Sequence, residues 1–126
     1  MSDAPMDAIA ARIQTALGAA DLAEFADLLH PDVRWGPPDD PNSGCTNRKQ
    51  VLTGHRRGVN AGVRAEVFEC QVFDCRILIG TRIWGGDEEH AAESVERWQV
   101  FTVNGGQIVD IVGYDERSEA LARSGG

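Results

Sequence analysis

The hydrophobic positions between residues 94 and 115 predict two long strands paired in a hairpin. β-Branched and aromatic residues fill both halves, and Asn104-Gly105-Gly106 lies between them. Glycine readily adopts the positive φ angles of a tight turn, and either two-residue turn places odd residues of the first strand opposite even residues of the second. One face should then carry Glu96, Trp98, Val100, Thr102, Val109, Ile111 and Gly113, and the other Arg97, Gln99, Phe101, Val103, Ile108, Asp110, Val112 and Tyr114. Neither face is polar throughout, so we expect other parts of the protein or a second subunit to cover both faces of the sheet.

Helical periodicity predicts three helices in the first half of the chain. The first spans Met6–Leu17, where isoleucine or leucine recurs every fourth residue. The second follows Asp21, an N-cap residue with a glutamate three positions later, and ends before Pro31. The third spans Arg48–Val59 behind a cap at Asn47, and it contains two glycines that weaken it by about 1 kcal/mol each relative to alanine.

The remaining segments predict more strands and two loops. A short strand at Val33–Trp35 and longer ones at Arg64–Phe73 and Arg76–Trp84 precede the hairpin. Turn-forming residues make loops of Gly36–Thr46 and Gly85–Glu93, and a last helical turn or two follows Asp115. Helices gathered before long antiparallel strands imply an α+β domain with helices on one face of its sheet.

The composition indicates one acidic domain. The chain has 126 residues and a net charge of −8, which argues against nucleic acid and anionic membrane surfaces as partners. No apolar run approaches the length of a membrane span, and the N-terminus lacks the apolar core of a signal peptide. The cysteines have no metal-ligand spacing, and no His, Asp or Glu cluster has it either. We therefore expect a reduced, cytoplasmic protein without a metal or another cofactor.

Three segments, in this order, resemble the nuclear transport factor 2-like superfamily and, within it, the SnoaL-like proteins of bacteria. They are D-L-A-E-F-A-D-L-L-H-P-D-V-R-W at 21–35, C-T-N-R-K-Q-V-L at 45–52 and W-Q-V-F-T-V-N-G-G-Q-I-V-D-I-V-G-Y-D-E-R at 98–117. The resemblance implies a single domain over residues 1–126, with a cone-shaped, strongly bent antiparallel sheet wrapped around three N-terminal helices, as in cystatin-like folds. It also implies a pocket between sheet and helices, and a homodimer.

The resemblance further indicates which side chains enter that pocket. In the steroid isomerases of the superfamily, inward positions of the hairpin correspond to Trp98, Val100 and Ile111, and the short strand sends Trp35 inward. Glu96 follows Trp98 by alternation along the strand. With Arg48 as a clamp for a ligand carboxylate or phosphate, these four apolar side chains form the predicted ligand-binding set.

The known catalytic groups of the superfamily are incomplete in this chain. The isomerases take a proton with an Asp that falls at about Pro37, and an oxyanion-donating Asp falls on Trp98, whose indole donates one hydrogen bond but cannot carry a proton. Relatives resembling limonene-epoxide hydrolase need an Asp that falls on Gly113. Neither mechanism therefore has all the residues it needs.

Three titratable residues stay candidates for acid–base chemistry, each with a structural alternative. Glu96 would be a carboxylate near two indoles, or would lie at the solvated rim or pair with an arginine. His55 lies on the apolar stripe of the third helix, either as a catalyst or as a hydrogen-bonded core residue. Asp39 is a possible base in the loop, or simply a turn residue. Arg48 lies on a basic helix edge that could equally be solvated.

Three functions follow as alternatives. The first is binding of a small organic ligand in an apolar pocket. The second is an isomerase, cyclase or hydrolase that uses a pocket acid–base residue, and the third is a structural or partner-binding dimer with a filled pocket. We expect a homodimer formed through the outward sheet face, because an apolar patch would otherwise be exposed. Its residues would be Phe101, Val103, Ile108, Val112 and Tyr114.

Overall fold

The computed structural model describes residues 6–19, 21–36, 44–84 and 94–124. In these ranges the helices are α1 (Met6–Ala19), α2 (Leu22–Leu28), α3 (Arg48–Asn60) and α4 (Arg117–Ser124). The strands are β1 (Leu29–Gly36), β2 (Arg64–Phe73), β3 (Arg76–Trp84), β4 (Ser94–Asn104) and β5 (Gln107–Tyr114). The α+β class is therefore confirmed. None of the helices described is long and apolar enough to cross a membrane.

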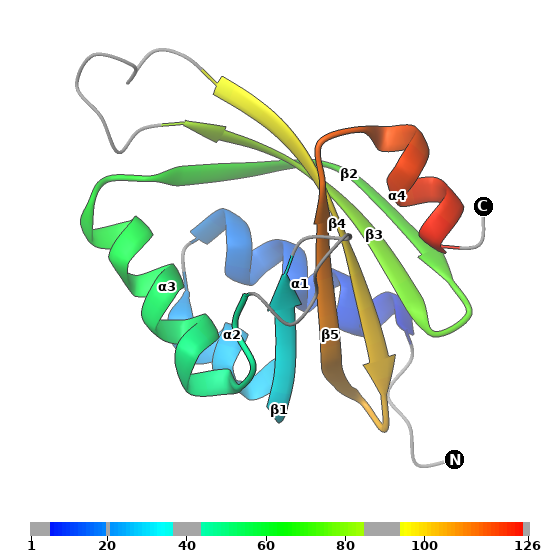
Figure 1. Cartoon of the computed structure of the whole chain (residues 1–126), viewed down its shortest axis with the longest axis horizontal. Coiled ribbons are helices and arrows are strands. Elements are labelled where there is room, and N and C mark those ends of the chain that lie inside the picture. Colours follow the sequence, from blue (N-terminus) through cyan, green and yellow to red (C-terminus); the bar gives the residue numbers. More distant parts are fainter. Residues whose placement is uncertain (1–5, 20, 37–43, 85–93, 125–126) are drawn as a thin grey trace.

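The sheet is mixed rather than wholly antiparallel. Its strand order is β1-β5-β4-β3-β2, with antiparallel pairing from β5 through β2 and parallel pairing between β1 and β5. Figure 1 shows the sheet bending around α1, α2 and α3, while α4 lies against the opposite face. We call the face toward the first three helices the inner face and the one toward α4 the outer face.

Two predicted helix caps are confirmed. Asp21 Oδ1 accepts a hydrogen bond from the backbone N–H of Glu24 at 3.1 Å, and Asn47 Oδ1 accepts one from that of Gln50 at 2.9 Å. Each carboxylate or amide oxygen satisfies a backbone donor that the first helical turn leaves unpaired. These caps fix where α2 and α3 begin, and so fix which face each helix turns to the sheet.

The main core fills the space between these helices and the inner face. Its fully buried side chains come from α1 and α2 on one side and from β1, β3, β4 and β5 on the other. They include Ile9, Ile13, Phe25, Leu28, Ile77, Ile79, Phe101, Ile108 and Ile111. A second, smaller cluster packs under α4 on the outer face and comprises Leu78, Val100, Val112, Tyr114 and Ala120.

A β-bulge in β5 overturns the predicted hairpin faces. At the turn, Gly105 and Gly106 have φ of 61° and 81°, and Val103 pairs with Ile108, odd opposite even as predicted. The register then shifts, so that Thr102 pairs with Asp110 and the residue between the two β5 partners is extra. Beyond the bulge, odd-numbered residues of β4 therefore pair with odd-numbered residues of β5, and even-numbered with even-numbered, so the two strands share faces differently from the prediction.

The bulge also removes the argument for a dimer through the outer face. Of the five side chains expected to form an exposed patch there, Phe101, Val103 and Ile108 lie in the inner core. The other two, Val112 and Tyr114, are buried beneath α4. The predicted apolar patch is thus wrong, and the homodimer stays a prediction without that support.

Candidate functional site

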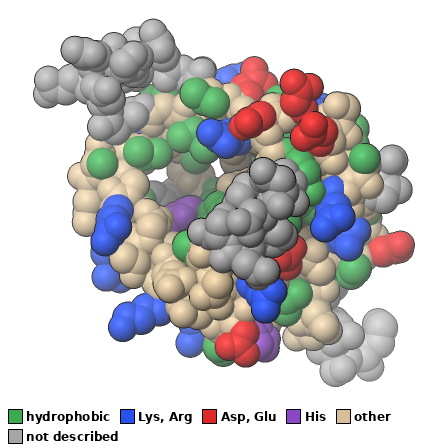
Figure 2. All heavy atoms as spheres, in the orientation of Figure 1, with side chains coloured by type: hydrophobic (Ala, Val, Ile, Leu, Met, Phe, Trp, Pro, Cys, Tyr) green, Lys and Arg blue, Asp and Glu red, His purple; other side chains and the backbone are tan. Residues whose placement is uncertain are grey.

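A cavity of about 880 Å³ lies between α3, the end of α1 and the inner face of the sheet. Figure 2 shows the hollow opening toward the viewer between α3 and the strands above it. Its walls come from α1, β1, α3, β2, β3 and β4, and most of the side chains are apolar. This volume falls within the range of small-molecule sites, which are typically about 300–1,000 Å³.

Glycine makes one wall of this cavity. Gly54 and Gly58 lie one helical turn apart on α3 and both line the cavity, together with Val51 and Val59. A Cβ atom added at Gly54 would meet no heavy atom within 4 Å, and one at Gly58 would meet only Val63, at 3.8 Å or more. The absence of side chains at these two positions therefore leaves space rather than relieving a clash.

His55 lines the cavity and packs against two aromatic side chains. The His55 ring lies 4.8 Å from the ring of Phe25 and 5.7 Å from that of Trp35, measured between centroids. Phe25 is buried in the core, whereas Trp35 and His55 line the cavity. Contact with two aromatic rings fixes the position of the imidazole and excludes water from part of it.

The protonation of His55 is perturbed by this environment. Burial lowers the pKa of His55 below its ordinary value of 6.5, because the charged imidazolium loses solvation. Within the described part of the chain, His55 makes no hydrogen bond, yet no buried side-chain nitrogen or oxygen is left without a partner. Its ring nitrogens must therefore reach accessible space, and they can donate and accept hydrogen bonds there as a neutral imidazole.

The other polar groups of the cavity are sparse. Gln99 lines it from β4, and the hydroxyl of buried Thr81 donates a long hydrogen bond of 3.4 Å to the backbone oxygen of Arg97. Arg64 is the one lining residue with a permanent charge among those described, and none of the described lining residues is acidic. The site offers hydrogen bonds at a few points in a mainly apolar space.

Of the predicted site residues that the structure describes, two line the cavity and five lie elsewhere. Trp35 and His55 line it. Ile111 is the register partner of Trp35, but it lies in the core beneath the cavity. Arg48 is exposed and lines a separate surface groove with Lys49, Arg56 and other residues. Asp39 lies outside the described residues.

Trp98, Val100 and Glu96 were expected to face inward, and that expectation is wrong. β4 alternates regularly, so placing Phe101 in the inner core turns these three even-numbered residues to the outer face. Val100 is buried under α4, whereas Glu96 is exposed and pairs in register with Arg82. Glu96 therefore cannot act as a cavity carboxylate.

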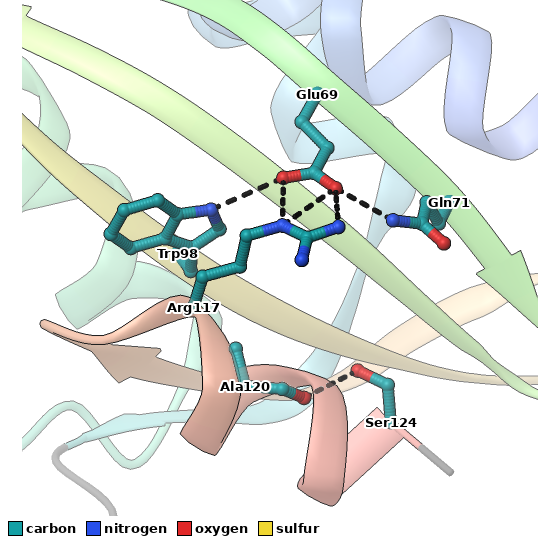
Figure 3. Close-up of polar contacts among 6 residues, drawn as sticks. All are labelled: Glu69, Gln71, Trp98, Arg117, Ala120 and Ser124. Carbon is teal, nitrogen blue, oxygen red and sulfur yellow. Dashed lines mark hydrogen bonds and ion pairs between the residues drawn. The ribbon is translucent and has the colours of Figure 1, made fainter. Parts of the chain in front are cut away.

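Trp98 belongs to a polar cluster that attaches α4 to the sheet (Figure 3). Arg117 at the start of α4 donates from Nε and Nη2 to the Glu69 carboxylate, with N···O distances between 2.7 and 3.1 Å. Trp98 Nε1 and Gln71 Nε2 donate to the same carboxylate at 3.3 and 2.6 Å. Gly80 permits this arrangement, because a Cβ there would lie 3.1 Å from Trp98 Nε1. We assign the indole a structural role.

The Glu69 cluster predicts a specific acid sensitivity. The hydrogen bonds from Arg117 lower the pKa of Glu69 from 4.5 to about 2, because they stabilise the ionised carboxylate. A folded-state pKa below the unfolded one gives stability that is present above about pH 4.5 and is lost as the pH falls toward about 2. We expect Glu69→Gln to flatten the wild-type decline in the free energy of unfolding over that window.

Urea denaturation at several pH values measures this effect. Glu66→Gln is the matched control, because Glu66 is also a β2 glutamate, and among the described residues its one ion pair is with exposed Arg82, at 3.5 Å. Its denaturation should keep the wild-type pH dependence. If Glu69→Gln and wild type lost stability in parallel between these pH values, the assigned role of the carboxylate would be wrong.

Sequence reasoning missed several cavity residues for an identifiable reason. Gln99 was not proposed because the hairpin faces were assigned without the bulge, and Thr81, which lies on β3 between Ile79 and Ile83, was not considered. The α3 glycines were recorded only as a cost to the helix. Their spacing on the same stripe as Val51 and His55 was the available signal, since a glycine repeated on a helix face indicates that something approaches its backbone closely or needs space beside it.

Comparison with known proteins identifies the fold. No family model and no curated protein matches the chain. An NTF2-like protein of unknown function from Cytophaga hutchinsonii superposes with a TM-score of 0.70 at 8% identity, covering 93% of this chain and 95% of that one. A hypothetical protein with a ketosteroid isomerase-like fold from Catenulispora acidiphila, in complex with trimethylamine, gives 0.66 at 18% identity, over 93% and 92% of the two chains.

A third similar structure also contains a small molecule. TerC, co-crystallised with polyporic acid, superposes with a TM-score of 0.68 at 12% identity, covering 98% of this chain and 100% of that one. At these identities the likeness establishes architecture. The chain has the nuclear transport factor 2-like fold, as the sequence resemblance implied.

Proposed function

We propose that this chain binds one small, mainly apolar organic molecule in the cavity beside α3. The observation that carries the proposal is a cavity of about 880 Å³ whose helix wall is kept open by glycine. Each glycine costs the helix about 1 kcal/mol relative to alanine, and a chain that needed only a stable core would gain by filling the space. Two structures of similar fold, one in complex with trimethylamine and one co-crystallised with polyporic acid, support the proposal that this fold holds a small molecule here.

Titration with N-phenyl-1-naphthylamine, an uncharged dye that fluoresces in apolar surroundings, tests the proposal. We expect saturable binding with one dye per chain. Native mass spectrometry of protein purified without added ligand provides an independent measurement, because a retained molecule would raise the mass of the folded chain. A chain that neither binds the dye nor carries a small molecule would favour the structural alternative with a functionally closed cavity.

A second candidate function is proton transfer within the same cavity. The observation that favours it is His55, a neutral imidazole held by aromatic contacts with its nitrogens accessible. As a general base it would take a proton from a bound substrate and return it to another atom, as an isomerase or cyclase requires. If such an activity is found, His55→Gln should lower kcat about 10²–10⁴-fold and remove the acidic limb of its pH profile.

The protonation of His55 can be measured without knowing any substrate. We expect the NMR titration of its Cε1–H signal, identified by its loss in His55→Gln, to have a midpoint below 6.5. Because the unfolded chain binds this proton more readily, the contribution of His55 to stability should be complete above pH 6.5 and decline below it. A midpoint at or above 6.5 would contradict the burial of the ring.

A further inference from the structure

The side-chain amide of Gln99 has no hydrogen-bond partner among the residues that the structure describes. Gln99 is the register partner of Ile79, a buried residue of the inner core, and it lines the cavity. Every buried side-chain nitrogen and oxygen in the described part of the chain has a partner, so the amide atoms must reach accessible space. On the inner face of the sheet that space is the cavity.

The neighbours of Gln99 leave room beside this amide. Its partner on β5 is Gly113, and a Cβ added there would meet no heavy atom within 4 Å. Thr81 lies diagonal to Gln99 on β3, and its hydroxyl donates to the backbone oxygen of Arg97, so the hydroxyl oxygen can still accept a hydrogen bond. The sheet wall therefore presents neutral donors and acceptors to whatever fills the cavity.

Among the described residues, no charged side chain is placed to meet a charged group inside the cavity. Arg64 begins β2, but its neighbour Ala65 lines the inner wall, so alternation turns the Arg64 side chain to the outer face. Arg97 shares the inner face with Gln99, but its guanidinium binds Asp115 at 2.9 Å. An ionic group on a ligand would therefore lose solvation in the cavity without gaining an opposite charge.

We propose that the ligand is an uncharged organic molecule whose carbonyl or hydroxyl oxygen hydrogen-bonds to the Gln99 amide, so that Gln99 determines which molecules bind. This rests on the proposed function and specifies its ligand class. The amide can donate to a carbonyl or accept from a hydroxyl, while the apolar body of the ligand lies against Trp35 and the α3 glycines. A site built to hydrogen-bond one oxygen disfavours an analogue without it, because the analogue leaves the amide unpaired.

Two naphthalene compounds of the same shape test the hydrogen bond. 2-Acetylnaphthalene carries a ketone oxygen, and 2-isopropenylnaphthalene carries a CH₂ group in its place. Displacement of N-phenyl-1-naphthylamine measures the binding of both. We expect Gln99→Met to weaken binding of the ketone about fivefold and to change binding of the alkene less than about twofold. The carboxylate 2-naphthoate should bind wild type about tenfold more weakly than the ketone at neutral pH.

Gln71→Met is the matched control. Gln71 is also a strand glutamine, but its amide donates to Glu69 at 2.6 Å, and it does not line the cavity. This variant should lower the midpoint of urea denaturation and leave the binding of both naphthalene compounds unchanged. Gln99→Met should keep the wild-type midpoint or raise it, because it removes an amide that has no partner among the described residues.

Three results would overturn this inference. The first is that Gln99→Met weakens both compounds equally or neither of them. The second is that 2-naphthoate binds wild type as tightly as the ketone does. The third is that Gln99→Met lowers the urea midpoint as Gln71→Met does, which would give the Gln99 amide a structural role. If N-phenyl-1-naphthylamine itself does not bind wild type, the proposed function fails instead.

Discussion

Phe101→Ala should lower the free energy of unfolding by about 3–5 kcal/mol, whereas Trp98→Ala should cost about 2 kcal/mol. Phe101 is fully buried among the inner-face side chains, and removing its ring opens a cavity in the main core. Trp98 is only partly buried at the edge of the outer cluster, so water can occupy part of the vacated space. Removing the larger Trp98 side chain is thus expected to lower the free energy of unfolding less than removing that of Phe101.

Urea denaturation of both variants measures the difference. If the free energy of unfolding falls with urea concentration at the same slope as in wild type, the variants expose the same surface on unfolding. Phe101→Leu serves as a control, because it keeps much of the buried apolar volume and should cost less than the alanine variant. The ranking depends on the bulge in β5. If Trp98→Ala were the more damaging change, the indole would lie in the main core and the hairpin faces would be those expected from simple alternation.

This hairpin shows how far the sequence determines the fold. Local patterns predicted the caps at Asp21 and Asn47 and the bounds of the long strands, because these depend on local chemistry. Local patterns also left two possible hairpin turns, and the structure has the one at Gly105-Gly106. A bulge depends instead on which of two registers buries more apolar surface across the whole sheet. Val109, at the bulge, differs in no obvious way from its neighbours in the sequence.

The same distinction between local and long-range features explains why only some residues of the candidate site were predicted. Trp35 and His55 follow from a short strand and a helix stripe, both of which are local features. Gln99, Thr81 and Arg64 line the cavity only because three strands meet the end of α3 and the end of α1, and no local pattern encodes that meeting. Conversely, the family resemblance placed Trp98 and Ile111 on one face, and Glu96 followed Trp98 by alternation. The inserted residue in β5 pairs Ile111 with Phe101 instead, so Trp98 and Glu96 lie on the opposite face.

Replacing both α3 glycines should separate stability from binding, and this is the second large effect that we expect. Gly54→Ala/Gly58→Ala should raise the free energy of unfolding by about 1 kcal/mol per site, since alanine is the better helix former and its Cβ meets nothing closer than 3.8 Å. Affinity for N-phenyl-1-naphthylamine should change little, because two methyl groups occupy a small part of about 880 Å³.

The leucine pair should behave differently. Gly54→Leu/Gly58→Leu adds two branched side chains to the cavity wall, and in a helix leucine is nearly as favourable as alanine. We expect stability at or above that of wild type and dye affinity reduced tenfold or more, measured on the same samples by urea denaturation and fluorescence titration. A structural role for the glycines predicts the reverse, namely that the larger side chains destabilise the helix packing while binding is unaffected. Lost stability with intact binding would therefore mean that α3 needs glycine to pack, and that the space beside it is not the ligand site.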